Sequence, residues 1–412
     1  MIKVNRHILS NGLRLLHHYD DSTQMVALNI VYDVGSKDED PQRTGFAHLF
    51  EHLMFGGSVN IPDFDTPLQM AGGENNAWTN NDITNYYSVI PKQNVETAFW
   101  LESDRMLSLD FSERSLSVQK QVVIEEFKQR NLNQPYGDLY LLLRPLAYKI
   151  HPYRWSTIGK EISHIADATL DEVKTFFYRH YAPNNAILSV AGNITYEDTL
   201  WLAEKWFGPI ESRDIVKRKL PQEPIQNSAR FGEVSRNVPL DLVTKAYHIC
   251  GRNHSDYAGV DLLSDILSNG TSSRLYRELV MDRKIFAEID AYVTGDIDPG
   301  LFVVSGKPNR GVNIEDADKI ITEEINRLII KKVDESELEK VVNKFESNYL
   351  FSNLNYLNKA TNLAYHELIG KAEDINREIN KYLSVTPDKL LRIASETFVP
   401  ENCTTFYYRA QN

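Results

Sequence analysis

The chain has 412 residues, of which 42% are hydrophobic and 25% charged, and its formal net charge is −12. This length favours two or more domains, and this composition is typical of a packed globular protein rather than of a disordered or fibrous one. The acidic chain has no cluster of lysine and arginine to form the basic surface that nucleic acids and anionic membranes require, so we expect neither as a partner.

The cysteines and the N-terminal residues bear on the compartment. Cys250 and Cys403 lie far apart and are not in a metal-binding spacing, so we expect two buried thiols rather than a disulfide framework. The first residues form no apolar signal core, and no run is long enough to cross a bilayer. We therefore expect a cytoplasmic protein, or a periplasmic one if a leader has been removed.

The first elements lead into a short helix. Residues 14–34 alternate around a turn at 20–22 and predict two strands. Residues 45–57 predict a helix, because apolar side chains recur there at a spacing of three and four. The glycine pair at its end, Gly56 and Gly57, is expected to stop it.

His48, Glu51 and His52 fall together on the other side of this helix. Two histidines four residues apart place their imidazoles one turn apart on one face, where they can bind a single zinc ion. Glu51 lies beside that ion, where it can act as a general base. The pattern H-x-x-E-H is the inverted form of the H-E-x-x-H helix of zinc peptidases. The alternative is a pair of solvated or capping histidines on an amphipathic helix.

The rest of the first half alternates strands with helices. A glycine pair at 72–73 opens a hairpin, and prolines 135, 145 and 152 interrupt a later helical region. Thr169 and Glu172 form a capping-box pattern. The expected elements are hairpin arms at 76–79 and 85–90, helices at 95–107, 115–130, 170–181 and 196–206, and a strand at 186–191.

The second half repeats the order of the first. One constant offset along the sequence aligns Thr169 with Thr386, Asp171 with Asp388, Val173 with Leu390, Pro183 with Pro400, and Asn185 with Asn402. A slightly smaller offset places Asp261, Ser264 and Asp265 where His48, Glu51 and His52 stand. The second copy therefore lacks the histidine pair.

This duplication predicts the domain organisation. We expect a zinc-bearing half at 1–208, a charged, proline-containing linker at 209–237, and a homologous half without a metal site at 238–412. The fold class is α+β, with two homologous halves that each contain an antiparallel-rich mixed sheet packed by helices. The halves are expected to enclose a substrate chamber.

A catalytic zinc site needs a third protein ligand. The helix that contains residues 119–128 offers two adjacent carboxylates, Glu125 and Glu126. Its apolar face is expected to comprise Val122, Val123 and Phe127, and the spacing alone leaves both glutamates open. The alternative for either is an ordinary solvated carboxylate.

The chain resembles the pitrilysin/insulinase family of inverted-motif zinc peptidases, most of all its short-chain branch, which includes the mitochondrial processing peptidase and bacterial relatives. The resemblance covers nearly the whole chain. It rests on the His48–His52 motif, the hairpin residues 72–79, the segment 122–126, and the residues 273–276. It implies a zinc-dependent endopeptidase that hydrolyses peptides or short unfolded polypeptides, with one zinc ion per chain.

The same resemblance assigns roles to individual residues. It selects Glu126 as the third zinc ligand, with Glu125 as the fallback, and it makes Glu51 the catalytic base. It implies that the peptide pairs with an edge strand that includes Asn76, Ala77 and Thr79. Main-chain pairing of this kind predicts broad specificity.

Two departures from the family pattern concern the site. Gln119 replaces an outer-shell glutamate, so zinc affinity or the basicity of water at the metal is expected to differ. A substrate-binding arginine and tyrosine of the second half correspond to Val280 and Ala287, while Arg274 and Tyr276 nearby are expected to serve the fold. The resemblance therefore implies a dimer, one form of which is a heterodimer in which a homologous subunit supplies the arginine and tyrosine. The alternative is a non-catalytic scaffold or a peptide-binding subunit of the same fold.

Overall fold

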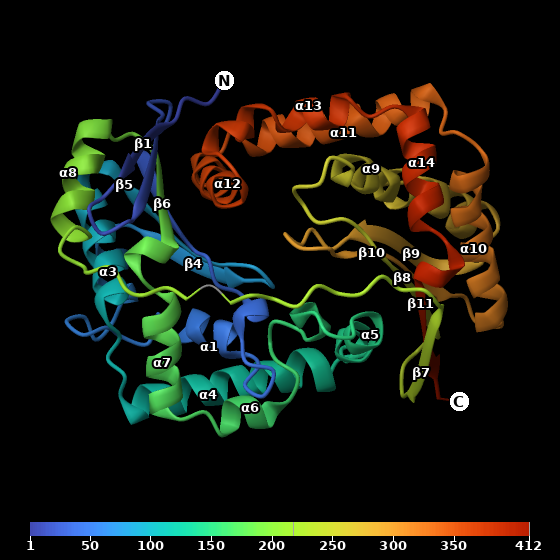
Figure 1. Ribbon diagram of the computed structural model, residues 1–412, viewed down its shortest axis with the longest axis horizontal. Coiled ribbons are helices and arrows are strands. Elements are labelled where there is room, and N and C mark those ends of the chain that lie inside the picture. Colours follow the sequence, from blue (N-terminus) through green and yellow to red (C-terminus); the bar gives the residue numbers. More distant parts are fainter. Residues whose placement is uncertain (217, 412) are drawn as a thin grey trace. The chain divides into compact units, whose positions relative to one another are not determined.

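The computed structural model describes residues 1–216 and 218–411, which form two compact units (Figure 1). Each unit contains one mixed β-sheet with helices packed against it, so the expected α+β fold is confirmed. The first unit comprises Met1–Arg130, Trp155–Leu220 and Leu350–Arg377, and the second comprises Asn131–Arg154, Pro221–Tyr349 and Glu378–Asn412.

The sheet of the first unit has six strands in the order β1-β2-β6-β3-β5-β4. Strands β2 and β6 are parallel, and every other neighbouring pair is antiparallel. Strand β4 lies at one edge of this sheet, with β5 as its only strand neighbour among the described residues. The bounds are β1 Asn5–Ile8, β2 Arg14–Tyr19, β3 Met25–Tyr32, β4 Glu74–Thr79, β5 Thr84–Pro91 and β6 Ala186–Gly192.

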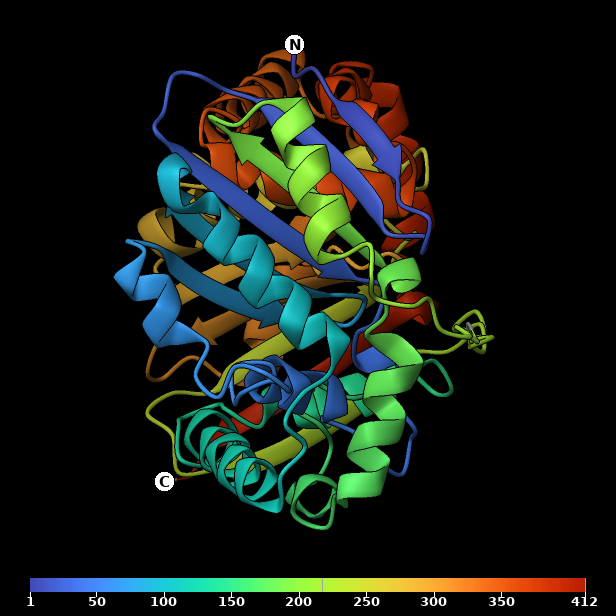
Figure 2. The same cartoon turned by 90° about the vertical axis from the view of Figure 1, so that its left-hand side faces the viewer.

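Helices cover both faces of this sheet because alternate residues of a strand point to opposite faces. Val26 and Leu28 of β3 belong to the main core, whereas Ala27 packs with Ala360 of α12 on the other face. Figure 2 shows α3 and α8 lying across the strands. The helices of this unit are α1 Phe46–Leu53, α2 Asp65–Met70, α3 Val95–Leu107, α4 Glu113–Phe127, α6 Ile162–Ala166, α7 Leu170–His180, α8 Tyr196–Trp206 and α12 Tyr356–Ile369.

The sheet of the second unit has five strands in the order β7-β11-β8-β10-β9. Here β7 and β11 are parallel, and the other pairs are antiparallel. The strands are β7 Arg230–Arg236, β8 Leu242–His248, β9 Phe286–Val293, β10 Leu301–Pro308 and β11 Cys403–Ala410. The helices are α5 Leu139–Ala147, α9 Tyr257–Ser268, α10 Ile314–Ile330, α11 Glu335–Ser352, α13 Glu378–Leu383 and α14 Pro387–Thr397.

The two sheets are copies of one design, as the sequence repeat predicted. The order β2-β6-β3-β5-β4 in the first unit matches β7-β11-β8-β10-β9 in the second, with the parallel pair in the same place. Thr169 and Thr386 cap the equivalent helices α7 and α14, and each hydroxyl accepts a main-chain N–H three residues on. The capping box of Thr169 and Glu172 is confirmed.

Each half of the sequence contributes one helix to the other unit. Helix α5 begins at Leu139 and α12 begins at Tyr356, the same offset that relates Thr169 to Thr386. Leu143 of α5 packs with Val303 and Phe406 of the second sheet, whereas α12 packs on β3 and β6 of the first sheet. The compact units are therefore built by an exchange of helices between the two sequence halves.

Three local expectations were wrong. Helix α1 ends at Leu53, before the glycine pair, because the N–H groups of Phe55 and Gly56 bond to carbonyls three residues back and close a tighter turn. Strand β7 lies inside the expected linker, and its mostly exposed residues lack the hydrophobic alternation that would have marked it. Val122 is 43% exposed, although its neighbour Val123 is buried, because consecutive helical residues point in different directions.

No helix in the described part of the chain is both long and apolar enough to span a membrane.

Candidate functional site

Glu39 holds the N-terminus of α1 in place. Its carboxylate oxygens accept the main-chain N–H groups of Gly45 and Ala47, each at 2.9 Å, and Trp155 Nε1–H donates to the same carboxylate at 3.1 Å. A carboxylate favours this position because it complements the unpaired N–H groups of the helix end. Burial nevertheless raises the pKa of Glu39 to about 8.

Gly45 is required where α1 begins. Its φ is +92°, in the left-handed region, and a Cβ there would lie 2.8 Å from the carbonyl oxygen of Ile158. A larger residue would therefore displace the start of the helix.

The apolar side of α1 is fixed in the core of the first unit. The Phe50 ring stacks on Phe176 and Tyr181, with centroids 5.1 and 5.0 Å apart. The Tyr86 hydroxyl donates to the Phe50 carbonyl oxygen at 3.0 Å. These contacts set the rotation of the helix and so direct the opposite side, with the two histidines, away from the core. The four predicted apolar residues, Phe46, Leu49, Phe50 and Leu53, are buried.

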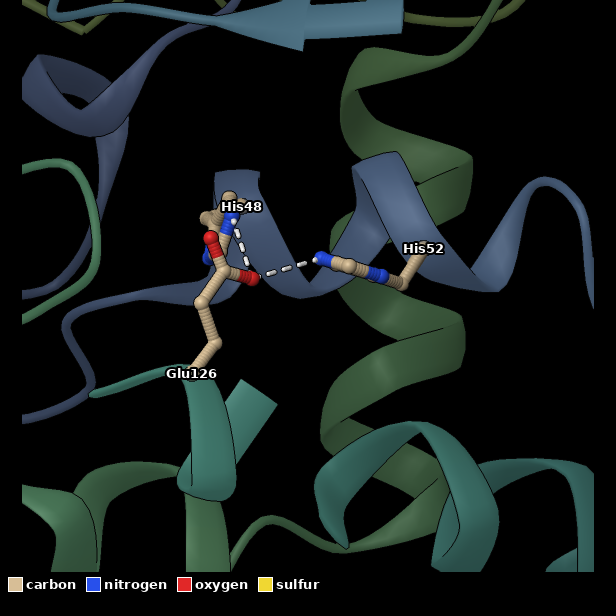
Figure 3. Close-up of side chains that lie close together, drawn as sticks. All are labelled: His48, His52 and Glu126. Carbon is tan, nitrogen blue, oxygen red and sulfur yellow. Dashed lines mark ion pairs between the residues drawn. The ribbon is translucent and has the colours of Figure 1, made fainter. Parts of the chain in front are cut away.

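His48 and His52 of α1 meet Glu126 of α4 in one cluster (Figure 3). Glu126 Oε2 lies 3.6 Å from His48 Nε2 and 3.3 Å from His52 Nε2. One nitrogen or oxygen atom of each side chain lies within 4.8 Å of the others. The structure thus brings together the three residues that were expected to bind zinc.

The chemistry of this cluster fits a zinc ion. His48 is 8% exposed, and burial lowers its pKa to about 4, so its imidazole is neutral near pH 7. The His48 Nδ1 and His52 Nε2 atoms are buried and make no hydrogen bond with the described residues. Two imidazoles and one carboxylate are a donor set of catalytic zinc sites. Each imidazole can therefore offer a ring nitrogen to the ion.

The geometry distinguishes the two candidate glutamates of α4. Glu125 is exposed and pairs with Lys128 at 2.7 Å. Glu126 is half-buried, and its interaction with His52 lowers its pKa. Glu126 is thus the residue whose carboxylate can complete the metal site.

Glu51 lies beside the cluster without belonging to it. Its carboxyl is half-buried, and burial raises its pKa, an effect that the nearby Thr79 hydroxyl partly offsets. His52, Glu126 and Arg130 also act electrostatically on it. A carboxylate with a raised pKa accepts protons more readily near neutral pH, which is what a general base requires.

The residues expected to bind substrate lie on the edge strand β4, against which α1 packs. Asn76 is exposed, whereas Ala77 and Thr79 are half-buried. The main-chain N–H of Ala77 donates to the Asn76 side-chain oxygen at 2.8 Å rather than to another strand. The strand therefore has the open edge that peptide pairing needs, and peptide binding by these three residues stays a prediction.

The outer-shell role of Gln119 also stays a prediction. Gln119 is half-buried on α4, and its side-chain nitrogen lies 3.6 Å from the position a Cβ would take at Gly56. Gln119 thus lies close to the C-terminal end of α1, the helix that contains the two histidines.

The equivalent positions of the second unit are engaged in other contacts. Asp261 Oδ2 accepts the Tyr382 hydroxyl at 2.7 Å, and Asp265 accepts the Asn269 amide. Arg274 forms a bidentate pair with Glu337 of α11, which fits the expected role in the fold. Val280 is half-buried and Ala287 is exposed on β9.

Sequence reasoning missed two residues that bear on the site. Glu39 precedes its helix by seven residues, outside any capping spacing, so no local signal indicated it. Arg130 pairs with Glu126 at 2.8 Å, and the separation of four residues on one helical stretch could have suggested that pair.

Comparisons with known proteins indicate the family of the chain. Two family models match consecutive parts of the chain, "Insulinase (Peptidase family M16)" over residues 14–159 and "Peptidase M16 inactive domain" over residues 167–345. The chain is 30% identical over 410 residues to the zinc protease PqqE of Helicobacter pylori, covering 97% of this chain and 91% of that protein.

Solved structures share the fold. A protease from Helicobacter pylori matches with a TM-score of 0.93 and 27% identity, over 99% of this chain and 100% of that chain. Pitrilysin matches with a TM-score of 0.80 and 16% identity, over 100% of this chain but 45% of the pitrilysin chain.

Proposed function

The chain belongs to peptidase family M16 and is a zinc protease of that family, and we propose that it acts as an endopeptidase on peptides or short unfolded polypeptides. The observation that carries this proposal is the cluster of His48, His52 and Glu126, with one ligand atom of each within 4.8 Å of the others. We assign one zinc ion per chain to this cluster.

His48, His52 and Glu126 would hold the ion, and zinc, when bound, supplies a Lewis acid for the carbonyl group and the water of peptide hydrolysis. Two sets of contacts on α1 support this assignment. Glu39 fixes the start of α1, and the stacked rings around Phe50 fix its rotation. These contacts orient the helix that carries both imidazoles, as a metal site requires.

Glu51 is the residue that moves the proton in this proposal. Its carboxylate takes a proton from the attacking water as the new bond to the carbonyl carbon forms. It then delivers that proton to the amide nitrogen, which leaves as an amine when the peptide bond breaks. Its raised pKa suits both steps.

Strand β4 would hold the substrate as an additional strand. An extended peptide can pair through its main chain with the open edge, where the Ala77 N–H is now held by the Asn76 side chain. Thr79, on the same strand, lies near Glu51. This nearness connects the strand that would bind the peptide with the residue that would act on it.

We further propose that the chain works as the zinc-bearing subunit of a dimer. The pitrilysin chain is more than twice as long as the part that matches this fold, so it has room for a second such unit. Val280 and Ala287 occupy the positions at which the family resemblance predicts an arginine and a tyrosine. A second copy of this chain would lack the same two side chains, so a homologous but different subunit fits the proposal better.

The proposal is tested by incubating internally quenched peptides with the zinc-loaded chain, alone and mixed with any similar protein encoded beside it. Hydrolysis by the wild type and its loss in Glu51→Gln would support the endopeptidase. Equal signals from the two proteins would favour the non-catalytic scaffold or peptide-binding subunit instead. Full activity of the isolated chain, with a monomeric mass by light scattering, would remove the need for a partner.

A further inference from the structure

Arg130 is the one lysine or arginine, within the part of the chain that the structure describes, that pairs with a candidate metal ligand. Its Nη1 atom lies 2.8 Å from Glu126 Oε1. The other oxygen, Oε2, faces His48 and His52. The carboxylate of Glu126 thus has the metal site on one side and a guanidinium on the other.

The two members of this pair differ in exposure. The Arg130 side chain is 69% exposed, whereas that of Glu126 is 17% exposed. Arg130 lies in a π-helical turn, Lys128–Leu132, that follows α4, and such turns are frequent at functional sites. Lys128 in the same turn pairs with Glu125 instead. Arg130 is therefore the cation of this turn that is directed to the site.

The charge of Arg130 reaches the whole centre. It is one of the charges that act electrostatically on His48, on Glu51 and on Glu126. No other lysine or arginine of the described residues is a main contributor at all three groups. A negatively charged group of a bound peptide near this centre would face the same positive charge.

A guanidinium has five N–H donors in a planar fork and matches a carboxylate with two parallel hydrogen bonds. One nitrogen of Arg130 is engaged by Glu126, and the exposure of the side chain leaves other donors facing solvent. An exposed ion pair of this kind stabilises a fold very little. A purely structural role would thus leave most of the side chain unused.

We propose that Arg130 is a substrate-binding residue that selects peptides with a carboxylate close to the bond that is cut. The inference rests on the proposed peptidase function and adds a substrate class to it. The carboxylate can belong to an aspartate or glutamate side chain or to the free C-terminus of the peptide. Both sources offer the same planar acceptor, so the experiment must separate them.

The test compares quenched peptides that differ in one group. The first has an internal glutamate and blocked ends, the second has glutamine at that position and blocked ends, and the third has the glutamine with a free C-terminus. Several positions of the glutamate are scanned. The readout is the ratio of kcat/KM for each carboxylate peptide to that for the blocked glutamine peptide.

We expect the wild type to prefer a carboxylate peptide by about tenfold or more, as for a hydrogen bond between charged groups. In Arg130→Gln this ratio should fall to about one, and in Arg130→Lys it should be partly kept. Lys128→Gln is the matched control, because Lys128 is a cation of the same turn but pairs with Glu125 instead of Glu126. This variant should keep the wild-type ratio. Zinc content is measured for every variant.

Fluorescence anisotropy of the same peptides measures their binding to Glu51→Gln. It reports the preference for a carboxylate without hydrolysis. If the wild type cleaves all three peptides equally well, the inference is wrong and the peptidase function stands. If Arg130→Gln loses zinc but keeps the preference, Arg130 only positions Glu126, and the inference is also wrong. If the wild type cleaves nothing, the proposed function fails, and the dissociation constants of Glu51→Gln decide whether Arg130 selects carboxylates.

Discussion

Asn185 and Asn402, which are equivalent in the sequence repeat, make the same hydrogen bond in the two units. The Asn185 side-chain amide donates to the carbonyl oxygen of His180 at 2.9 Å, and that of Asn402 donates to the carbonyl oxygen of Thr397 at 2.8 Å. Each amide also donates to one more main-chain carbonyl. Both residues close the turn from a helix into the next strand, so the duplication extends to individual hydrogen bonds.

Substituting these asparagines should destabilise the protein in both units. We expect Asn185→Ala and Asn402→Ala each to lower the free energy of unfolding by about 1–3 kcal/mol, because carbonyl groups lose their donor. The cost should be larger for Asn185, which is 3% exposed, than for the half-buried Asn402. Urea unfolding measures both, with the exposed neighbour Glu401→Ala as control. A variant as stable as the control would show that its hydrogen bonds are dispensable.

Glu39 should make stability depend on pH. Its pKa is raised by burial from 4.5 to about 8. Between these values folded Glu39 holds a proton that the unfolded chain has released, so the free energy of unfolding should fall as the pH rises through this window. Each unit of pKa shift corresponds to about 1.4 kcal/mol.

The Glu39→Gln variant isolates this contribution. Glutamine keeps an oxygen that can accept the N–H groups at the start of α1, but it does not titrate. Burial also raises the pKa of Asp38, to about 6, and Asp38 is present in both proteins, so its contribution cancels in the difference. We expect the free energy of unfolding of the wild type minus that of Glu39→Gln, measured by urea unfolding, to decrease steadily from pH 5 to pH 9. Parallel curves would contradict the assignment.

Replacing Glu126 should release zinc, whereas replacing its neighbour should not. Outer-shell substitutions at metal sites cost about 10–100-fold in affinity, and loss of a direct ligand should cost at least as much. We expect Glu126→Gln to lower zinc affinity by about 100-fold or more in a competition assay with a fluorescent chelator. Glu125→Gln, matched in size and charge change, should bind zinc like the wild type. Equal losses in the two variants would mean that charge near the site, rather than ligation, explains the effect.

Zinc should stabilise the folded chain. A ligand that binds only the folded state at 100 times its dissociation constant adds about 2.7 kcal/mol to the free energy of unfolding. We expect this gain for the wild type on adding zinc and its reversal by a chelator, followed by urea unfolding. Glu126→Gln should show little gain at the same zinc concentration. A gain that is the same in both proteins would place the stabilising ion elsewhere.

Much of the fold could be predicted from the sequence because its signals are local. Alternation marked β2 and β3, the capping box marked α7, and the constant offset between the halves predicted two related sheets. The exchange of α5 and α12 could not be predicted, because periodicity shows that a helix has an apolar face but not which sheet covers it. Strand β7 was missed because it pairs with β11, the last strand of the chain, and pairing between segments so far apart leaves no local pattern.

The candidate site was predictable to a similar degree. The spacing of His48 and His52 was sufficient to predict that one helix, α1, carries both imidazole ligands, since a helix turn brings residues four apart together. Spacing could not distinguish Glu125 from Glu126, because the choice depends on how α4 packs against α1. The family resemblance selected Glu126, and the structure places Glu126 beside the histidines. Glu39 and Arg130 act through contacts that only the folded chain reveals.

The most direct test of the central claim is the X-ray absorption spectrum of the chain loaded with one equivalent of zinc. We predict two imidazole nitrogens at about 2.0–2.1 Å and a carboxylate oxygen at about 2.0–2.2 Å, with no sulfur. A shell of sulfur at about 2.3 Å, or a spectrum without imidazole scattering, would contradict the assignment of His48, His52 and Glu126 as the zinc site.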